Sequence, residues 1–275
     1  DFSVDYDKLE EYLKNNHEKV SCLFITNLIG YGGQIERLDA IAKKYGIKLM
    51  FDNCESGNSR YCSKDNEWKH IGADHTHTHS FYLGHLFNGC EMGCIATNSE
   101  EEYQEFLMYR NHGLIRVIKD LDNVKNRLFE RVQNKLVDDA FSFARVGNNY
   151  RPVEVNSYIA SLDLKREKEY KEKRNRLFTL FKFGLGHKFY LPYENSLVDN
   201  THFCLPIIIN KNYQVKDVLM GKIKQLLKDE MIESRPIISQ SLTRQSIYQR
   251  YGDYRELETC EFLTQWGMYI GLHPS

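Results

Sequence analysis

The chain has 275 residues, enough for one large domain or two modest ones, and its 41% hydrophobic and 27% charged residues are typical of a globular protein. A formal net charge of −1 argues against a general attraction to nucleic acid or to an anionic membrane. No apolar run approaches the ~20 residues of a membrane span, and DFSVDYDKLEEYL at the N-terminus lacks the basic head and apolar core of a secretion signal. We therefore expect a cytoplasmic protein with no nucleic-acid or membrane partner.

The first elements predict a parallel sheet. Residues 6–17 form a charged amphipathic helix pattern, and residues 21–27 a short buried-strand pattern. Residues 34–46 place apolar side chains on one helical face before a terminal glycine, and residues 47–52 are the next strand. Strand, helix and strand in this rhythm indicate a right-handed βαβ unit. Because ligands bind at the carboxyl ends of such strands, Asp52 falls where a site is expected.

Strands and helices continue along the chain. We predict strands at 77–83 and 93–97, and a helix at 99–113 that Ser99 caps. Residues 114–147 are charged and irregular in pattern. One long helix is expected from Pro152 to about residue 184.

The C-terminal part predicts a smaller α+β unit. It contains an apolar strand at 202–210, a helix at about 214–229, the segment 231–236 and a last helix near 256–267. We place the boundary between the two units near residue 165.

The stretch HTHTHSFYLGH carries four histidines: His75, His77, His79 and His85. In a strand the first three would share one face, where imidazoles could hold a divalent metal. Alternatively, the first two lie in the approach to the strand and bond to water or to the backbone. No carboxylate or cysteine stands at close fixed spacing, so we expect no metal site.

The chain has an odd number of cysteines, with no C-x-x-C pair. In a domain of this size they are expected to be free thiols of a reducing compartment. The seven residues are Cys22, Cys54, Cys62, Cys90, Cys94, Cys204 and Cys260.

Five short motifs occur in one order over most of the chain. They are DNCESG at 52–57, SFYLGH at 80–85, CEMGCIATN at 90–98, RNHG at 110–113 and NNYRPVE at 148–154. Together they resemble the DegT/DnrJ/StrS family of sugar aminotransferases, which depend on pyridoxal 5'-phosphate. Each motif is weak alone, but their shared order is fairly specific.

The resemblance implies an α/β fold of the aspartate-aminotransferase (type I) class. Residues 1–165 would form the cofactor-binding large domain with a mixed, mostly parallel sheet, and residues 166–275 the small α+β domain. The family's Gly/Ser-rich phosphate loop has no counterpart in this chain. We therefore expect a large domain that is truncated at its N-terminus.

Two substitutions point to one branch of the family. His85 stands where the aminotransferases have the lysine that forms a Schiff base, and Asp52-Asn53-Cys54-Glu55 stands where they read Asp-Ala-Ala-Gln. Both features resemble the 3-dehydratases of nucleotide-linked 4-keto-6-deoxyhexoses. An imidazole forms no stable imine, so the cofactor would work as its amine, pyridoxamine 5'-phosphate, regenerated by glutamate.

The resemblance also implies roles for single residues. Asp52 would bind the pyridinium nitrogen of the cofactor, and Glu55 would lie beside its ring. Ser80 would contact the cofactor phosphate. His85 would carry the proton in catalysis, because its pKa lies near neutrality.

Two further residues suggest an assembly with shared sites. Asn149 matches the asparagine that reaches the cofactor phosphate of the neighbouring subunit, which implies a homodimer. Arg151 would bind the substrate or a carboxylate, or else form a structural salt bridge.

Two alternatives stay open. A conventional sugar aminotransferase would need a lysine near position 85, but none occurs between Lys69 and Lys119. A non-catalytic remnant of the family would fit the expected truncation. However, retention of Asp52, Glu55 and His85 argues against a remnant.

Overall fold

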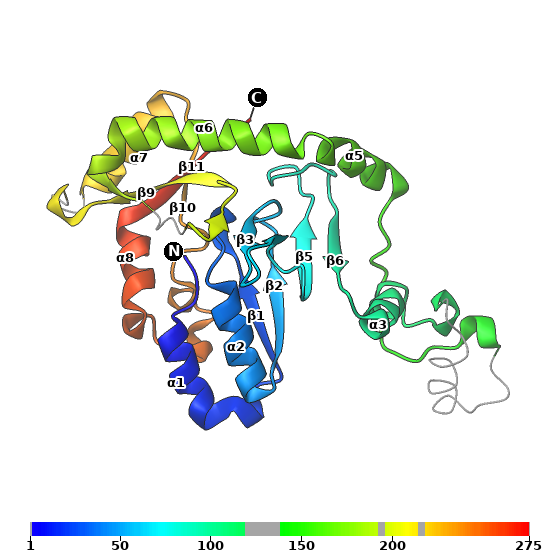
Figure 1. The fold of residues 1–275 in the computed structure, drawn as a ribbon. Coiled ribbons are helices and arrows are strands. Elements are labelled where there is room, and N and C mark those ends of the chain that lie inside the picture. Colours follow the sequence, from blue (N-terminus) through cyan, green and yellow to red (C-terminus); the bar gives the residue numbers. More distant parts are fainter. Residues whose placement is uncertain (1, 119–137, 192–195, 214–217, 275) are drawn as a thin grey trace.

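A computed structural model describes residues 2–118, 138–191, 196–213 and 218–274. Its central sheet has the strand order β1-β2-β5-β6, in which the first three strands are parallel and the last is antiparallel (Figure 1). The predicted mixed, mostly parallel sheet is confirmed. The four strands are β1 (Cys22–Thr26), β2 (Lys48–Asp52), β5 (Thr76–Ser80) and β6 (Gly93–Ala96).

One face of this sheet is covered by α1 (Tyr6–Asn16) and α2 (Ile35–Tyr45). Leu38 of α2 and Phe51 of β2 are fully buried in the resulting core. Burial of side chains of this size stabilises the fold by roughly 1.5–3 kcal/mol each. The predicted βαβ unit is thus present, and the helix ends at Gly46 with a left-handed φ of 64°, as expected for a C-terminal glycine.

The second half of the large sheet leads into a peripheral helix, α3 (Glu100–Arg110). The side chain of Ser99 accepts a hydrogen bond from the Glu102 N–H at 3.2 Å, so the predicted cap is confirmed. Figure 1 shows α3 beyond β6, at the side of the molecule.

The predicted long helix from Pro152 to residue 184 is wrong. The structure has α5 (Glu154–Leu164) and α6 (Glu167–Leu185), with non-helical backbone at Arg166 (φ −97°, ψ 5°). The Asp163 carboxylate accepts bonds from the Asn88 N–H (2.8 Å) and the Tyr170 hydroxyl (3.0 Å). These tertiary contacts outweigh the helical propensity of the segment.

The C-terminal sheet is antiparallel, in the order β10-β11-β9-β7, and Trp266 and Met268 lie in its core. The predicted α+β character is confirmed, although the sequence analysis placed no strand at residues 267–271, which form a central strand of this sheet. The strands are β7 (Phe189–Tyr190), β9 (Cys204–Ile209), β10 (Ser234–Pro236) and β11 (Gly267–Gly271), and the helices are α7 (Val218–Asp229) and α8 (Glu258–Trp266).

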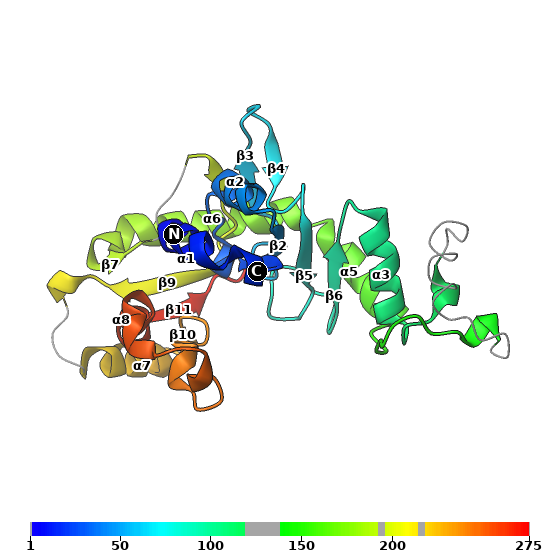
Figure 2. The ribbon, with the colours of Figure 1, turned by 90° about the horizontal axis from the view of Figure 1, so that it is seen from below.

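A third sheet joins the two parts of the chain. Its strands are β4 (Trp68–His70), β3 (Arg60–Cys62) and β8 (Val198–Asp199), all antiparallel. Sequence patterns missed it because strands of two or three residues carry no periodic signal. Figure 2 shows β3 and β4 projecting beside α2.

No helix of the described ranges is long and apolar enough to cross a membrane. Short 3₁₀ turns connect several of the helices and strands. The turns lie at His17–Lys19, Leu28–Gly30, Ile115–Val117, Asp139–Phe141, Gly186–Lys188, Lys211–Tyr213, Leu242–Arg244, Gln249–Tyr251 and Tyr254–Glu256.

Gly30→Ala is expected to destabilise the fold by about 3 kcal/mol or more. Gly30 has a φ of +92°, and a Cβ atom there would lie 1.6 Å from the carbonyl oxygen of Thr201. Gly46→Ala is the matched control, because Gly46 also has a left-handed φ but open space around it. We expect the control to lose only about 1 kcal/mol. Urea unfolding measures the free energy of unfolding of both variants. Equal losses of stability would contradict the close contact at Gly30.

Candidate active site

The predicted site residues of β2 and β5 lie at the carboxyl edge of the parallel sheet. Asp52 ends β2 and is in register with Thr78 of β5. Oδ1 of Asp52 accepts hydrogen bonds from the Cys54 N–H (3.0 Å) and the Thr78 hydroxyl (3.2 Å). These two bonds fix the orientation of the Asp52 carboxylate at the end of β2. Sequence reasoning missed Thr78, although the alternation of THTHS places it on the same strand face as Ser80.

Glu55 is bound to the turn that follows β1. Its Oε2 accepts a hydrogen bond from the Ile29 N–H at 2.7 Å. Burial raises the pKa of Glu55, and the nearby Asp52 charge raises it further, although the Ile29 N–H opposes this shift. Ile29 has a left-handed backbone (φ 48°, ψ 29°), which strains a β-branched residue by roughly 1–3 kcal/mol. The turn is thus held in a costly conformation that aims an N–H at the carboxylate.

His85 lies next to the same loop. Its Nδ1 is 3.0 Å from the carbonyl oxygen of Cys54. Because a carbonyl can only accept, Nδ1 carries the proton and Nε2 keeps its lone pair. Burial lowers the pKa of His85, although the Cys54 carbonyl and the Asp52 charge oppose this shift. A neutral imidazole with an unprotonated Nε2 can act as a base.

Ser80 ends β5, at the same edge as Asp52. Its Oγ accepts a hydrogen bond from the Tyr82 N–H at 3.2 Å, and the hydroxyl can still donate its own hydrogen to an anionic group. The structure therefore brings Asp52, Glu55, Ser80 and His85 to one edge of one sheet, where strands and their short loops hold them.

Asn149 and Arg151 lie elsewhere. Asn149 forms an isolated antiparallel bridge with Asn111, at the end of α3, and its Oδ1 accepts a bond from Nε of Arg151 at 2.9 Å. Both side chains are exposed. The structure does not bring them to the Asp52 edge within one chain.

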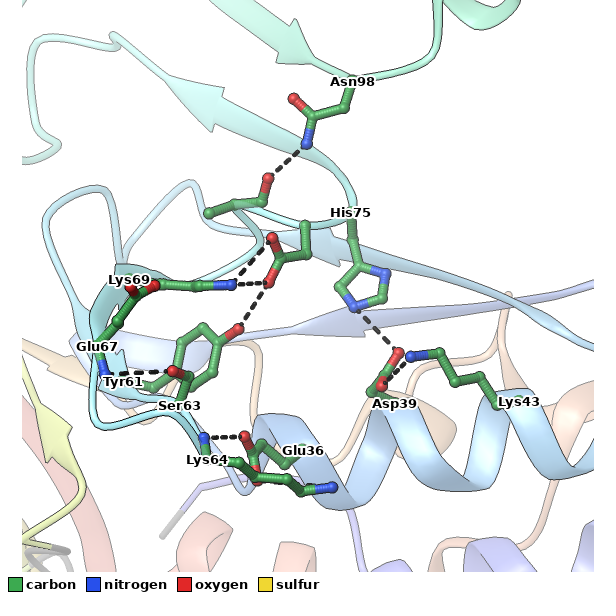
Figure 3. Close-up of polar contacts among 12 residues, drawn as sticks. Glu36, Asp39, Lys43, Tyr61, Ser63, Lys64, Glu67, Lys69, His75 and Asn98 are labelled. Carbon is green, nitrogen blue, oxygen red and sulfur yellow. Dashed lines mark hydrogen bonds and ion pairs between the residues drawn. The ribbon is translucent and has the colours of Figure 1, made fainter.

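The three histidines of the HTHTH stretch have different surroundings. His75 precedes β5, and its Nε2 lies 3.5 Å from the carboxylate of Asp39 on α2, which also binds Lys43 (Figure 3). His77 and His79 meet edge to face with ring centroids 4.9 Å apart, and His70 follows at 5.8 Å from His79. In the described part of the chain, no three His, Cys, Asp or Glu side chains are placed to hold a metal ion.

Acidification is expected to destabilise the chain through His79. Burial, together with the neighbouring His77 and His70, lowers the pKa of His79 to about 4. The unfolded chain, with an ordinary histidine pKa, therefore binds more protons than the folded chain between about pH 6.5 and 4. Stability is full above this window and falls as the pH drops through it, by up to about 3 kcal/mol from this group.

His79→Asn is expected to flatten this pH dependence, as measured by urea midpoints at pH 7 and pH 4.5. His112→Asn is the control, since His112 is exposed and has a left-handed φ of 62° that asparagine tolerates. A pH dependence that His79→Asn leaves unchanged would contradict the assignment.

The comparisons with known proteins cover the whole chain. The DegT/DnrJ/EryC1/StrS aminotransferase family model matches residues 1–275. GDP-4-keto-6-deoxy-D-mannose 3-dehydratase of Yersinia pseudotuberculosis is 24% identical over 98% of this chain and 66% of its own length. The enzyme of the same name from Escherichia coli O55:H7 is 24% identical over 98% of this chain and 67% of its own length. The chain thus spans about two thirds of the length of these curated relatives.

Solved structures share the fold. E. coli GDP-4-keto-6-deoxy-D-mannose-3-dehydratase with bound hydrated PLP superposes with a TM-score of 0.82 at 24% identity, over 99% of this chain and 67% of that one. A DegT DnrJ EryC1 StrS aminotransferase from Brucella abortus superposes with a TM-score of 0.77 at 18% identity, over 99% and 66%. The predicted family resemblance and the predicted type I fold are confirmed.

Proposed function

Because the chain belongs to the DegT/DnrJ/EryC1/StrS aminotransferase family, we propose that it is a pyridoxal/pyridoxamine 5'-phosphate-dependent 3-dehydratase of a nucleotide-linked 4-keto-6-deoxyhexose. Glutamate is the proposed amino donor. The observation that carries the proposal is His85, which stands in place of the Schiff-base lysine and binds the Cys54 carbonyl beside Asp52. The named relatives support it, since both curated matches above are 3-dehydratases.

The donors and acceptors at the sheet edge fit this cofactor. A carboxylate oxygen of Asp52 suits a protonated ring nitrogen, and the Ser80 hydroxyl suits a phosphate oxygen. When bound, the cofactor supplies an electron sink that allows a proton to leave carbon and a hydroxyl to be expelled. A related dehydratase has been solved with a trapped PLP-glutamate geminal diamine, which supports glutamate as the donor.

Within this site, Asp52 would keep a positive charge on the ring nitrogen. The Thr78 hydroxyl and the Cys54 N–H hold Oδ1 of Asp52. The carboxylate is therefore fixed before any ligand binds, and its orientation costs nothing during the reaction.

His85 would take a proton at Nε2 and deliver it to a neighbouring atom. Its Nδ1–H stays bound to the Cys54 carbonyl throughout, so the imidazole keeps one orientation in both protonation states. The positive charge of the protonated ring is offset by Asp52, which raises the pKa of His85 against the effect of burial. Glu55 would lie beside the ring of the cofactor as a buried polar neighbour.

We further propose that the working form is a homodimer. Asn149 and Arg151 lie away from the Asp52 edge in one chain, so they would serve the site of a second copy, where Asn149 reaches a phosphate and Arg151 an anionic substrate group. Domain boundaries at 1–165 and 166–275 are likewise proposed, and they coincide with the break between α5 and α6.

A conventional sugar aminotransferase is the weaker candidate. Two UDP-4-amino-4,6-dideoxy-N-acetyl-beta-L-altrosamine transaminases are also relatives, at 24% and 20% identity. Residue 85 is a histidine, however, and it cannot form the stable imine on which that activity depends.

The test is to mix the purified chain with pyridoxal phosphate and glutamate, and to follow the cofactor spectrum together with 2-oxoglutarate. We expect conversion to the pyridoxamine form without a lysine linkage that borohydride can trap. GDP- and CDP-linked 4-keto-6-deoxy sugars are then tested for loss of the 3-hydroxyl. A trapped lysine linkage, or transamination of the sugar without dehydration, would overturn the proposal.

A further inference from the structure

Phe203 contacts the proposed proton carrier from the far half of the chain. It lies just before β9, and its ring centroid is 5.4 Å from that of His85 at an interplanar angle of 84°. Tyr82 faces His85 in the same edge-to-face manner at 5.6 Å and 84°. Tyr82, however, is 45% exposed, whereas Phe203 is half-buried in the core. Phe203 is therefore the more tightly packed of the two aromatic neighbours of His85.

The Phe203 side chain is wedged between the two loops of the site. On one side it packs against the cluster that contains Phe81 and Leu86, in the segment that follows β5. On the other side it packs against Ile29 and Tyr31, in the segment that follows β1. The ring thus touches both the loop that carries His85 and the turn that binds Glu55.

Both backbone polar groups of Phe203 are hydrogen-bonded. Its N–H donates to the carbonyl oxygen of Ile29 at 3.3 Å. Its carbonyl oxygen accepts from Nη1 of Arg174 on α6 at 2.7 Å, and the same nitrogen lies 3.5 Å from the carbonyl oxygen of His202. Two independent elements therefore fix where the ring can point.

Arg174 is an unusual anchor. It is only 6% exposed, burial lowers its pKa to about 10, and its Nε has no hydrogen-bond partner within the described ranges. None of the ion pairs between described residues includes it. Burial of a cation bound to carbonyls rather than to a carboxylate is costly, which calls for an explanation beyond simple stability.

We propose that Phe203 is a positioning residue for His85. Anchored through Arg174 and Ile29, its ring keeps the imidazole turned so that Nδ1 faces the Cys54 carbonyl, and it excludes water from that side. The groups that face His85 are the Asp52 carboxylate, the Cys54 carbonyl and the Tyr82 ring. Phe203 adds no charge to them, so it acts through orientation and dryness alone. This inference deepens the proposed function, because it specifies what prepares the proton carrier.

The test is the titration of His85 by NMR with ring-labelled histidine, in the full chain without cofactor, with the His85→Gln spectrum used for assignment. Loss of the ring in Phe203→Ala admits water, so we expect the pKa of His85 to rise by about half to one pH unit. The nitrogen chemical shifts are also expected to show a mixture of the two tautomers in place of one. Phe203→Leu, which keeps most of the volume, should give a smaller change in the same direction.

Phe189→Ala is the matched control. Phe189 is another half-buried phenylalanine of the C-terminal core, and it stacks on Phe181 rather than on His85. Its truncation is expected to leave both the titration and the tautomer of His85 unchanged. If Phe203→Ala does not fold, the titration and the tautomer of His85 in Phe203→Leu test the inference.

The inference would be overturned if a folded Phe203 variant kept the wild-type pKa and tautomer of His85. An equal change of both quantities in Phe189→Ala would overturn it as well. Since the NMR readout needs neither cofactor nor substrate, it tests the role of Phe203 even if the proposed reaction is absent. Where that reaction is present, Phe203→Ala should also shift the acidic limb of its pH–rate profile to higher pH, because the pKa of His85 is expected to rise.

Discussion

Asp52→Asn is expected to slow the conversion of pyridoxal phosphate to the pyridoxamine form by on the order of 10²–10³-fold, the usual cost of removing one preorganised electrostatic partner. Asparagine has the shape of aspartate, and it can still accept the hydrogen bonds that Thr78 and Cys54 donate to Oδ1. It carries no negative charge, however, and so it cannot stabilise a protonated ring nitrogen. The rate of 2-oxoglutarate release under single-turnover conditions measures the loss.

Asp39→Asn is the control for this substitution. Asp39 is also a carboxylate near the sheet, but it lies on α2 and pairs with Lys43 at 2.6 Å. We expect its variant to react at the wild-type rate. Should Asp52→Asn react within twofold of the wild type, Asp52 would not be the partner of the ring nitrogen.

His85→Asn is expected to lower the same rate by about 10²–10⁴-fold, the range typical of a lost general acid–base group. Asparagine can donate to the Cys54 carbonyl, as Nδ1 of His85 does at 3.0 Å, but it cannot take up and deliver a proton at neutral pH. Cofactor affinity should change little, since Asp52 and Ser80 are intact. Comparison of the binding constant with the single-turnover rate separates the two effects.

His85→Lys complements this variant. A lysine at the end of the same loop has an amine that can form an imine with the aldehyde of the cofactor. The expected result is a borohydride-trappable linkage that the wild type lacks. His112→Asn, at an exposed histidine, is the control for loss of a histidine as such. A His85→Asn enzyme with undiminished single-turnover rates would remove His85 from the role of proton carrier.

Much of the large sheet could be predicted from local patterns. The apolar spacing of 34–46 and the glycine that follows it define α2, and the adjoining apolar runs define β1 and β2. These signals are local, because a helix or strand that buries one face must repeat apolar residues at its own period. The position of Asp52 at a strand end follows directly. The cap at Ser99 could also be predicted, because a serine at a helix start can accept a hydrogen bond from an N–H of the first turn.

Assignment of the site depended on matching motifs rather than on periodicity. Neither spacing nor composition distinguishes His85 from the other histidines of the HTHTH stretch. Their difference is physical: His85 binds the Cys54 carbonyl beside Asp52, whereas His75 lies against Asp39 on the helix side of the sheet.

The remaining features of the fold depend on contacts between residues that are distant in the sequence. The segment 152–184 divides into α5 and α6 near Asp163, whose carboxylate accepts hydrogen bonds from the Asn88 N–H and the Tyr170 hydroxyl. The partner Asn88 is 75 residues away in the sequence, so no local pattern predicts this contact. The third sheet exists because Arg60 of β3 meets Asp199 of β8, far along the chain.

The contacts around His85 also depend on the tertiary structure. Local sequence patterns specify α2 and the strands β1 and β2, together with the carboxyl ends of those strands, since hydrophobic periodicity and capping act within a few residues. No local pattern predicts that Phe203 contacts His85, or that Arg174 binds the backbone of Phe203. Those contacts join residues that are distant in sequence, and they follow from how α6 and β9 pack over the sheet edge, because close packing selects neighbours by shape and volume rather than by position in the chain.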